Sequence, residues 1–298
     1  MNIGKIIRLL NAVLQNDTQR QGMTSIPFVG MISATRAHRL HSVSLQQSAA
    51  IVILSGQKVV TMGAETCTLS EGDIFLYPSM QETTIENIPD PGTGRYMALC
   101  LSFNVEMLAD VLSGQLDKEK QFSRIPLKDM CASCTPSAAS SLTHLLEMAA
   151  AHPGNKRLLS LCLEEFLILI SEETNCLPML WQAMSTWTAR CGRLVGMKPE
   201  RKWTAHDVAK RMNISERTLR RNLGEEGASL SGILREVRIS TGLSLLQTGN
   251  LSVSETASRC GYSSASRFAG LFKERFGVSP SEVLRYKAES GSSLAESV

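Results

Sequence analysis

The sequence predicts an α+β protein, with a β-rich N-terminal barrel that carries helices and an all-α C-terminal domain. Three observations support this fold class. Short aliphatic and β-branched runs separated by glycine and proline occupy about residues 48–103. Apolar residues recur at helical spacing from residue 105 onward, and two similar helix pairs follow residue 200. A chain of 298 residues accommodates about two such domains.

The composition is typical of a cytoplasmic protein. Hydrophobic residues make up 43% of the chain and charged residues 20%. No apolar run reaches the roughly 18–20 residues that cross a bilayer, and the N-terminus lacks the features of a secretory signal. The eight cysteines are scattered, which favours a reducing compartment over a disulfide scaffold. We therefore expect a cytoplasmic location and no membrane partner.

The net charge of +3 is unevenly distributed along the chain. Residues 1–199 carry a balance of −1, residues 200–287 a balance of +6 and the last eleven residues a balance of −2. A compact basic segment behind a neutral body is typical of nucleic-acid-binding modules, although many solvated helices are also basic. The charge therefore indicates a nucleic-acid partner only together with a motif.

The β-rich segment divides into short strands at regular spacing. Ser55-Gly56 separates AAIVILSG from KVVTMG, and Glu71-Gly72-Asp73 makes a turn within CTLSEGDIFLYPS. The runs TTIENI and YMALCLSFN lie on either side of a PDPGTG turn cluster. This spacing predicts a small barrel or sandwich.

Helical segments follow the strands. The runs are VEMLADVLSG, SAASSLTHLLEMAAAH and NKRLLSLCLEEFLILISEE. Between residues 156 and 172 the apolar residues form no single stripe, so this helix is either a homodimer surface on one side or entirely core. The connector over 174–200 is predicted to be helical around Leu180 to Val195 and broken at Pro178 and Pro199.

The first capped helix pair begins at Thr204, with Asp207 at the position that completes a capping box. A short turn at Asn213-Ile214 leads to a second helix, in which Leu219 and Leu223 share one face. The opposite face carries Glu216, Arg217, Arg220 and Arg221. Two helices joined by a tight turn, with a basic outer face, form the helix-turn-helix pattern.

The same pattern recurs about 48 residues later. Ser252 and Glu255 make a capping box, and Gly261-Tyr262 takes the place of the earlier turn. Phe268 and Phe272 take the places of the two leucines. The intervening LSGILREVRISTGLSLLQTGN predicts one long linker helix, so the C-terminal domain consists of two helix-turn-helix units joined by that helix.

Residues 201–287 resemble the DNA-binding domain of AraC-type transcriptional regulators. The resemblance rests on WTAHDVAKRMNISERTLRRNL, LREVRISTGLSLL and SVSETASRCGYSSASRFAGLFKERFGVSPSE. The runs LSGQKVVTMG, LSEGDIFLYPS and YMALCLSFN resemble the cupin-like effector domain of some members, which implies a cupin-like β-barrel. Thr241, where the family often has alanine, and Val283-Leu284 depart from the family pattern without removing a core position. The implied divisions are an effector and dimerisation domain over 1–173, a helical connector over 174–200, a DNA-binding domain over 201–288 and a flexible tail over 289–298.

The resemblance implies a transcriptional activator whose partners are double-stranded promoter or operator DNA and RNA polymerase. Its two recognition helices would enter successive major-groove segments about 34 Å apart. In the first helix we expect Arg217, Arg220 and Arg221 to bond guanine bidentately or to clamp phosphate. Glu216 is either a contact to cytosine or a solvated first-turn carboxylate.

The second recognition helix presents mostly small residues. They are Ala265, Ser266, Arg267 and Gly270. Because these residues offer few bidentate donors, we expect this helix to read shape, thymine methyls or backbone, and the first helix to carry most of the base specificity. Lys273 is expected at the DNA backbone. Ser215 and Ser264 begin the two recognition helices, as phosphate contacts or as plain N-caps.

The N-terminal barrel is expected either to hold a small effector or to be filled and used for dimerisation or for a protein co-regulator. Residues suited to an anionic, partly apolar ligand are Lys58, Phe75, Tyr77, Arg95 and Tyr96.

The sequence offers little support for a catalytic or metal site. The chain has no Walker loop, nucleophile elbow or dinucleotide fingerprint, so we expect no enzyme and no cofactor. The alternative, a cupin-type enzyme with an accessory DNA-binding domain, is disfavoured because the strands over 50–103 lack histidine. Cys131-Ala-Ser-Cys134 alone does not supply the four ligands of zinc, and the sequence favours no metal or redox role there. His38 and His41, beside two arginines, predict a solvated or ligand-facing loop.

Overall fold

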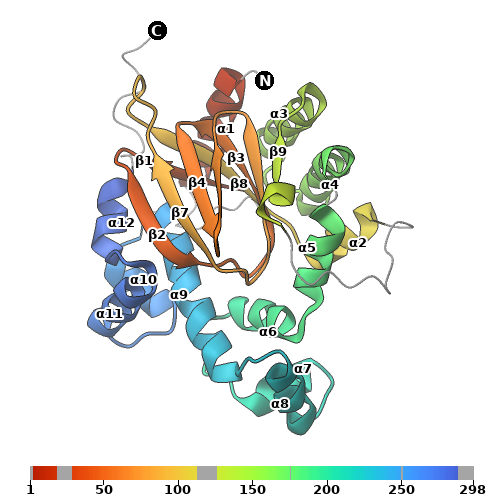
Figure 1. Ribbon diagram of the computed structural model, residues 1–298, viewed down its shortest axis with the longest axis vertical. Helices are drawn as coiled ribbons and strands as arrows, with labels where there is room; N and C mark the ends of the chain where they lie inside the picture. Colours follow the sequence, from red (N-terminus) through yellow and green to blue (C-terminus); the bar gives the residue numbers. More distant parts are fainter. Residues whose placement is uncertain (1–2, 19–28, 113–125, 175, 250, 288–298) are drawn as a thin grey trace.

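The computed structural model describes residues 3–18, 29–112, 126–174, 176–249 and 251–287. Its N-terminal part is built on β-sheets and its C-terminal part is helical, which confirms the predicted α+β class (Figure 1). The tail expected over 289–298 lies outside the described residues. None of the described helices is both long enough and apolar enough to cross a membrane.

In the described residues, nine strands form two antiparallel sheets. The strand order is β1-β8-β3-β6-β9 in one sheet and β2-β7-β4-β5 in the other. The strands are β1 (Val29–Ala34), β2 (His38–Val43), β3 (Ala49–Ser55), β4 (Gln57–Met62), β5 (Glu65–Leu69), β6 (Asp73–Tyr77), β7 (Thr83–Ile88), β8 (Tyr96–Ser102) and β9 (Cys131–Ser133). Strands β3 to β8 match the prediction, whereas the sequence pattern does not predict β1, β2 or β9.

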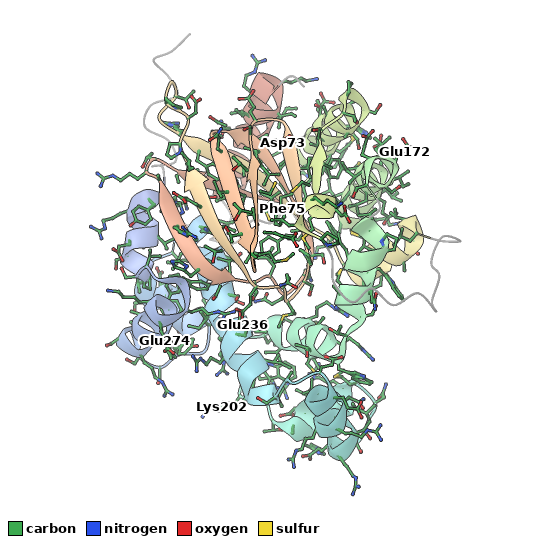
Figure 2. The ribbon with its side chains drawn as sticks, in the orientation of Figure 1. Asp73, Phe75, Glu172, Lys202, Glu236 and Glu274 are labelled. Carbon is green, nitrogen blue, oxygen red and sulfur yellow. The ribbon has the colours of Figure 1, made fainter. Side chains whose placement is uncertain are left out.

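The core of the barrel lies between the two sheets. All seven residues of β3 are buried, because both faces of this strand are covered. Phe75 and Tyr96 are fully buried, and Figure 2 shows Phe75 in the barrel interior. Each such side chain stabilises the fold by about 1.5–3 kcal/mol. The turn into β4 requires Gly56, since its φ is 78° and a Cβ would lie 2.3 Å from the Ile88 carbonyl oxygen.

Helices flank the sheets. They are α1 (Ile3–Thr18), α2 (Val105–Val111), the 3₁₀ helix η1 (Leu127–Met130), α3 (Pro136–Ala151) and α4 (Lys156–Glu173). Helix α3 packs against α1 and α4. Helix α4 buries Leu163 and Phe166 on its inner side, whereas Leu161 and Ile168 are 46% and 49% exposed. The helix therefore has one buried and one exposed apolar side.

The connector differs from the prediction in the position of its first break. Pro178 lies in the first turn of α5 (Cys176–Ser185), where the missing N–H of proline has no intrahelical partner to lose. The break occurs instead at Thr186, whose side chain accepts a hydrogen bond from Ala189 N and starts α6 (Trp187–Gly196). Pro199 lies beyond the end of α6, as predicted.

The C-terminal part repeats one helix pair on the two sides of a long helix. Its helices are α7 (Ala205–Arg211), α8 (Glu216–Glu225), α9 (Leu230–Thr248), α10 (Val253–Arg259), α11 (Ala265–Phe276) and α12 (Pro280–Tyr286). Both predicted capping boxes are formed, at Thr204 and at Ser252. The turns also match, since Asn213 has a φ of 55° and Gly261 a φ of 79°. We call α7–α8 the first unit and α10–α11 the second unit.

The two units belong to different hydrophobic cores. Leu219 and Leu223 of the first unit cluster with α6 and with the first half of α9. Phe268 and Phe272 of the second unit cluster with the second half of α9, and that cluster is continuous with the barrel core. Figure 1 shows the corresponding placement, with the second unit beside β2 and the first at the far end of α9.

Candidate nucleic-acid interface

The recognition helix of the first unit, α8, has an apolar side turned inward and a basic side turned outward. Leu219 and Leu223 are buried. The exposed side carries Arg217, Arg220 and Arg221, as the helical spacing predicts. Guanidinium groups placed this way are available to base edges or to phosphates.

Two of these arginines form exposed ion pairs, and Arg221 also donates from Nε and Nη2 to Asn222 Oδ1 at 3.4 Å. Arg220 Nη2 lies 3.4 Å from Glu216 Oε2, and Arg221 Nε lies 3.7 Å from Glu225 Oε1. The arginine side chains in these pairs are 74% and 68% exposed. An exposed pair at this spacing contributes only about 0.3–0.5 kcal/mol, so DNA can displace it at little cost. Glu216 also lies 3.5 Å from His206 and is therefore engaged within its own unit.

The recognition helix of the second unit, α11, presents a different surface. Its phenylalanines are buried, and Ala265 is half-buried. The exposed positions are Ser266, Arg267, Gly270, Lys273 and Glu274. A Cβ added at Gly270 would meet no atom within 4 Å, so packing does not require glycine there. This side of α11 is open enough to approach a DNA backbone closely.

Ser215 and Ser264 are N-caps in the structure. Ser215 Oγ accepts a hydrogen bond from Thr218 N at 3.1 Å, and Ser264 Oγ accepts one from Arg267 N at 3.2 Å. Each bond satisfies one of the unpaired N–H groups of the first helical turn. The first turn of a helix leaves further backbone N–H groups without intrahelical partners, and such groups can bind an anion.

An ion-pair cluster attaches the second unit to the barrel. Arg275 Nη2 of α11 lies 2.8 Å from Glu82 Oε1 beside β7 and 2.9 Å from Glu236 Oε1 of α9. Ser44, just after β2, donates to the same Glu236 oxygen at 2.5 Å. Arg275 is only 20% exposed, so water screens this cluster less than it screens the pairs of α8.

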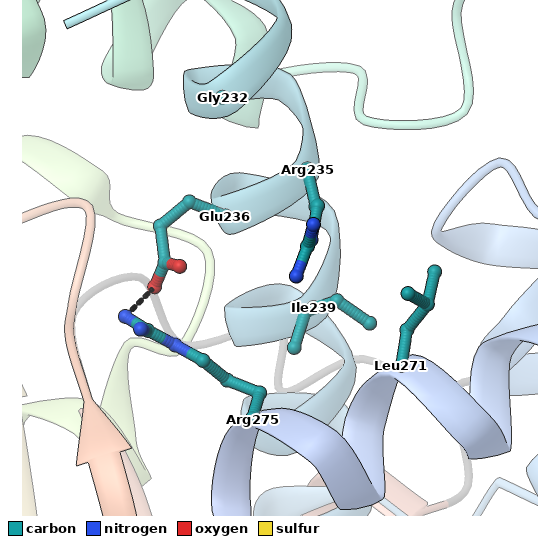
Figure 3. A pocket seen from close by; sticks show the side chains of 6 residues that line it. All are labelled: Gly232, Arg235, Glu236, Ile239, Leu271 and Arg275. Atoms are coloured by element: carbon teal, nitrogen blue, oxygen red, sulfur yellow. Dashed lines mark ion pairs between the residues drawn. The ribbon is translucent and has the colours of Figure 1, made fainter.

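A cavity of about 220 Å³ lies between α9 and α11, next to this cluster (Figure 3). It is lined by Gly232, Arg235, Glu236, Ile239, Leu271 and Arg275. Its charged groups are mostly neutralised within the protein, because Glu236 pairs with Arg275 and Arg235 Nη2 lies 3.2 Å from Glu274.

Helix α9 also contacts the barrel through Thr241. Gln46 Nε2 donates to Thr241 Oγ1 and to the Val237 carbonyl oxygen, both at 3.0 Å. The departure from the family pattern at 241 therefore supplies an acceptor to the N-terminal domain.

The segment around His38 was predicted to be a loop, and this prediction is wrong. His38 and His41 lie on β2, which pairs with β7. The His38 ring stacks on the Tyr286 ring of α12 with centroids 4.9 Å apart, and Thr35 N donates to the Tyr286 carbonyl oxygen at 2.9 Å. Burial lowers the pKa of His38. The strand is thus a contact surface for the C-terminal domain.

The structure brings only part of the expected effector set together. Lys58 and Tyr96 meet inside the barrel, with Lys58 Nζ 5.4 Å from the Tyr96 ring centroid. Phe75 and Tyr77 form a separate edge-on pair, and the Tyr77 hydroxyl donates to the Val43 carbonyl oxygen at 2.7 Å. Arg95 precedes β8 and is half-buried outside that interior.

Lys58 is a buried lysine without a carboxylate beside it among the described residues. Its Nζ donates to Asn87 Oδ1 at 2.6 Å, and burial lowers its pKa to about 7. The buried Tyr96 hydroxyl has no hydrogen-bond partner in the described part of the chain, and burial raises its pKa. Both groups would gain from a ligand that carries a negative charge or accepts hydrogen bonds.

Several residues of these contact networks were not predicted from the sequence motifs. Asn87 connects Lys58 to His38, with its Nδ2 3.3 Å from His38 Nε2. Asn87 could have been found, because Thr83 and Ile85 alternate with it on the buried side of β7. Glu82, Glu236 and Arg275 could not, because they meet only through long-range packing.

Two family models match the chain. The model of the AraC-type transcriptional regulator N-terminus matches residues 25–174, and a helix-turn-helix domain model matches residues 208–286. The first match covers half of the chain.

Curated relatives match shorter segments. The urease operon transcriptional activator of Escherichia coli is 37% identical over 89 residues, which cover 30% of this chain and 30% of the relative. The HTH-type transcriptional regulator GadX of Escherichia coli O6:H1 is 29% identical over 124 residues, which cover 41% of this chain and 45% of GadX. The chain thus spans less than half of the length of these relatives.

Solved structures match nearly the whole fold. ToxT from Vibrio cholerae O395 superposes with a TM-score of 0.59 at 15% identity, covering 88% of this chain and 98% of ToxT. Wild-type ToxT of strain SCE256 with a bound unsaturated fatty acid gives 0.56 at 15% identity, covering 87% and 95%. These likenesses show a shared two-part fold.

Proposed function

Because the chain belongs to the AraC-type transcriptional regulators, we propose that it activates transcription by reading promoter DNA chiefly through α8. It is a DNA-binding transcription regulator with a duplicated helix-turn-helix domain. The observation that carries the reading role of α8 is its exposed, weakly paired arginine face. The matched relatives are transcriptional regulators, and the protein would act without catalysis, in the cytoplasm, with RNA polymerase as a partner.

The two recognition helices would occupy successive major-groove segments on one side of the duplex. Arg217, Arg220 and Arg221 would supply bidentate bonds to guanine or clamps on phosphate. Ser266, Arg267 and Lys273 would position α11 on the backbone. In this arrangement residues 201–288 read DNA, residues 1–173 control the reader, and residues 174–200 join them.

Matched arginine substitutions test this division of roles in the full-length chain. The preferred site is first selected from random duplexes, and all single-base variants of that site are then measured at fixed salt. Arg220→Ala should weaken binding to the preferred site by about 1–3 kcal/mol, roughly 5- to 150-fold, and should relax the preference at one position. Arg267→Ala should weaken binding to all sequences alike.

Lys156→Ala, at the exposed start of α4 and off the Leu161 face, changes the charge equally and serves as the control. The proposal fails if Arg267→Ala relaxes base preference while Arg220→Ala lowers affinity uniformly. Lys273→Ala should reduce the slope of binding against salt by about one unit.

The effector we propose is a small organic anion with an apolar body, bound beside Lys58 and Tyr96. The support is the buried Lys58 amine, which has no carboxylate beside it in the described residues, and the Tyr96 hydroxyl, which has no hydrogen-bond partner among them. ToxT, of the same fold, binds an unsaturated fatty acid. A panel of fatty and aromatic acids should raise the melting temperature of the wild type but not of Lys58→Met, and a domain that responds to no member favours a filled barrel that binds protein.

The exposed side of α4 is our proposed homodimer surface. Leu161 and Ile168 lie two helical turns apart and are each about half exposed. Sedimentation equilibrium should show a dimer that Leu161→Glu dissociates, with Lys156→Glu, exposed and about 140° around the same helix from Leu161, as the control. A wild type that stays monomeric at all concentrations contradicts this surface.

A further inference from the structure

Two cysteines face each other where the two sheets of the barrel end. β5 is the last strand of one sheet, and β9 is the last strand of the other. Cys67 stands in the middle of β5 and Cys131 at the start of β9, with their sulfur atoms 3.1 Å apart. Both side chains are half-buried against the barrel core.

Both cysteines are fixed by regular structure. Cys67 pairs in register with β4, and Cys131 pairs in register with β6. A second link crosses the same edge, since Leu127 N donates to Glu65 Oε2 at 2.9 Å, and Cys131 Sγ lies 3.4 Å from the Leu127 carbonyl oxygen. The approach of the two sulfur atoms is therefore a property of how the sheets meet.

We propose that Cys67 and Cys131 form a reversible disulfide that joins the two sheets on oxidation. A disulfide bond is about 2.05 Å long, so the sulfur atoms need to approach by about 1 Å. Small side-chain rotations supply that distance without a change of strand register. In a reducing cytosol such a bond forms transiently and acts as a redox sensor.

The reaction is a thiol–disulfide exchange with a low-molecular-weight disulfide, RSSR. One cysteine thiolate attacks a sulfur of RSSR, forms a mixed disulfide and releases one RS⁻, which takes up the proton that the cysteine lost. The second thiolate attacks the protein sulfur of the mixed disulfide and releases the second RS⁻, which is protonated likewise. The two cysteines lose two electrons and two protons, and RSSR gains both to become two RSH.

A metal–thiolate site is a poorer explanation of this pair. In the described ranges no three histidine, cysteine, aspartate or glutamate side chains are arranged to hold a metal ion. The sequence alone left Cys131 with only Cys134 as a neighbour. The structure offers it a partner 64 residues away, on a different sheet.

The bond would hold β5 against the opposite sheet. β5 is the neighbour of β4, and Lys58 of β4 pairs in register with Leu69 of β5. Oxidation should therefore slow ligand exchange at Lys58, a consequence that rests on the proposed effector site, whereas the disulfide itself does not.

Redox titration of the full-length protein tests the proposal. The chain is equilibrated in glutathione buffers of rising oxidised fraction, remaining thiols are blocked with N-ethylmaleimide, and the unreduced digest is mapped by mass spectrometry. A peptide pair joined at 67 and 131, two hydrogen atoms lighter than its reduced parts, should form in the wild type and in Cys134→Ser. It should be absent from Cys67→Ser and from Cys131→Ser.

The melting temperature adds a second readout. Oxidation should raise it by about 5 °C or more in the wild type and in Cys134→Ser, and should not raise it in Cys67→Ser. Peptide mapping of the wild type is enough to show whether the 67–131 bond forms, so the proposal can be tested even if a variant fails to fold. A bond from 131 to 134, glutathione adducts that never resolve, or thiols that stay reduced throughout would overturn it. If the 67–131 bond forms but exchange of a bound acid is unchanged, only the consequence for the effector is lost.

Discussion

The two helix-turn-helix units share one motif but are built into the molecule differently. The first unit shares its core with α6 and the first half of α9, and its recognition helix has an arginine face. The second unit shares its core with the barrel, and its recognition helix presents small residues. Arg275 and Tyr286 fasten that side of the C-terminal part to the barrel. The local motif and its long-range attachment are therefore independent of each other, so that one unit can supply base contacts while the other responds to the barrel.

The largest test of this comparison removes one buried side chain from each core. Phe272→Ala should lower the free energy of unfolding by about 3–5 kcal/mol and Leu219→Ala by about 2–5 kcal/mol. Because the cores differ, Phe272→Ala should speed hydrogen exchange in the barrel strands as well as in α11. Leu219→Ala should speed it only in α6, α7, α8 and the first half of α9. If both variants sped hydrogen exchange equally throughout the chain, the two units would share a single hydrophobic core.

The next effect is a pH dependence centred on Lys58. Burial lowers the pKa of Lys58 to about 7, whereas an unfolded lysine keeps its proton to about pH 10.4. Between these values the unfolded state binds more protons than the folded state, so stability rises with pH. Relative to Lys58→Met, the wild type should gain on the order of 2 kcal/mol between pH 7 and 9 in chemical denaturation.

This pH dependence also separates the two units. Lys58 reaches Tyr286 through Asn87 and His38, and no such chain of contacts leads from Lys58 to α8 in the described residues. Hydrogen exchange in α12 should therefore slow as pH rises, after correction for the intrinsic rate, while α8 should not change. An equal change of hydrogen exchange in α12 and α8 would contradict the idea that Lys58 is coupled to the barrel-bound part of the C-terminal domain alone.

A smaller effect comes from the ion-pair cluster. Arg275→Met keeps the apolar stem but removes the pairs with Glu82 and Glu236, and should cost about 1–2 kcal/mol because Glu82 is more than half exposed. Exchange should increase in α11 and near residue 82. Arg235→Met breaks an exposed pair on the same α9 surface and should change stability by less than about 0.5 kcal/mol. Equal losses of stability in the two variants would show that the ion pairs of Arg275 do not help to attach the second unit to the barrel.

The smallest expected loss of stability comes from the capping boxes, which both units have. Thr204→Ala and Ser252→Ala each remove one capping box and should each cost about 1 kcal/mol. Thermal denaturation should give similar losses, because the caps are local. If Ser252→Ala lowered the stability more than twice as much as Thr204→Ala, loss of the cap in the second unit would also weaken its packing against the barrel.

The features that sequence predicts well here are local. A cap, its carboxylate and the turn after it lie within a few residues, so both units and α9 were predictable, as were the outward arginines of α8. Pro178 misled because proline ends a helix only outside its first turn. The polar run of β2 obscured its buried residues His38 and Leu40, and the strand is irregular between Leu40 and Val43.

The candidate site was predictable only in part for the same reason. Lys58 and Tyr96 belong to different sheets, and no spacing in the chain predicts that they meet. Arg95 appeared suitable by type, yet it lies before β8. Nothing near Cys67 or Cys131 predicts their approach either, because it follows from how two sheet edges close.

The length of α9 has a consequence for how this protein family changes over time. One residue added to the middle of that helix would turn everything beyond it by about 100° and shift it by about 1.5 Å. In the proposed complex the second unit would leave the face of the duplex that the first unit occupies. An insertion between Val237 and Thr241 would also cost Gln46 one of these two partners. The DNA pitch would therefore disfavour insertions and deletions anywhere between residues 230 and 248, and the Gln46 contacts would disfavour them further between residues 237 and 241. We expect related chains to vary here by substitution and to keep the residue count.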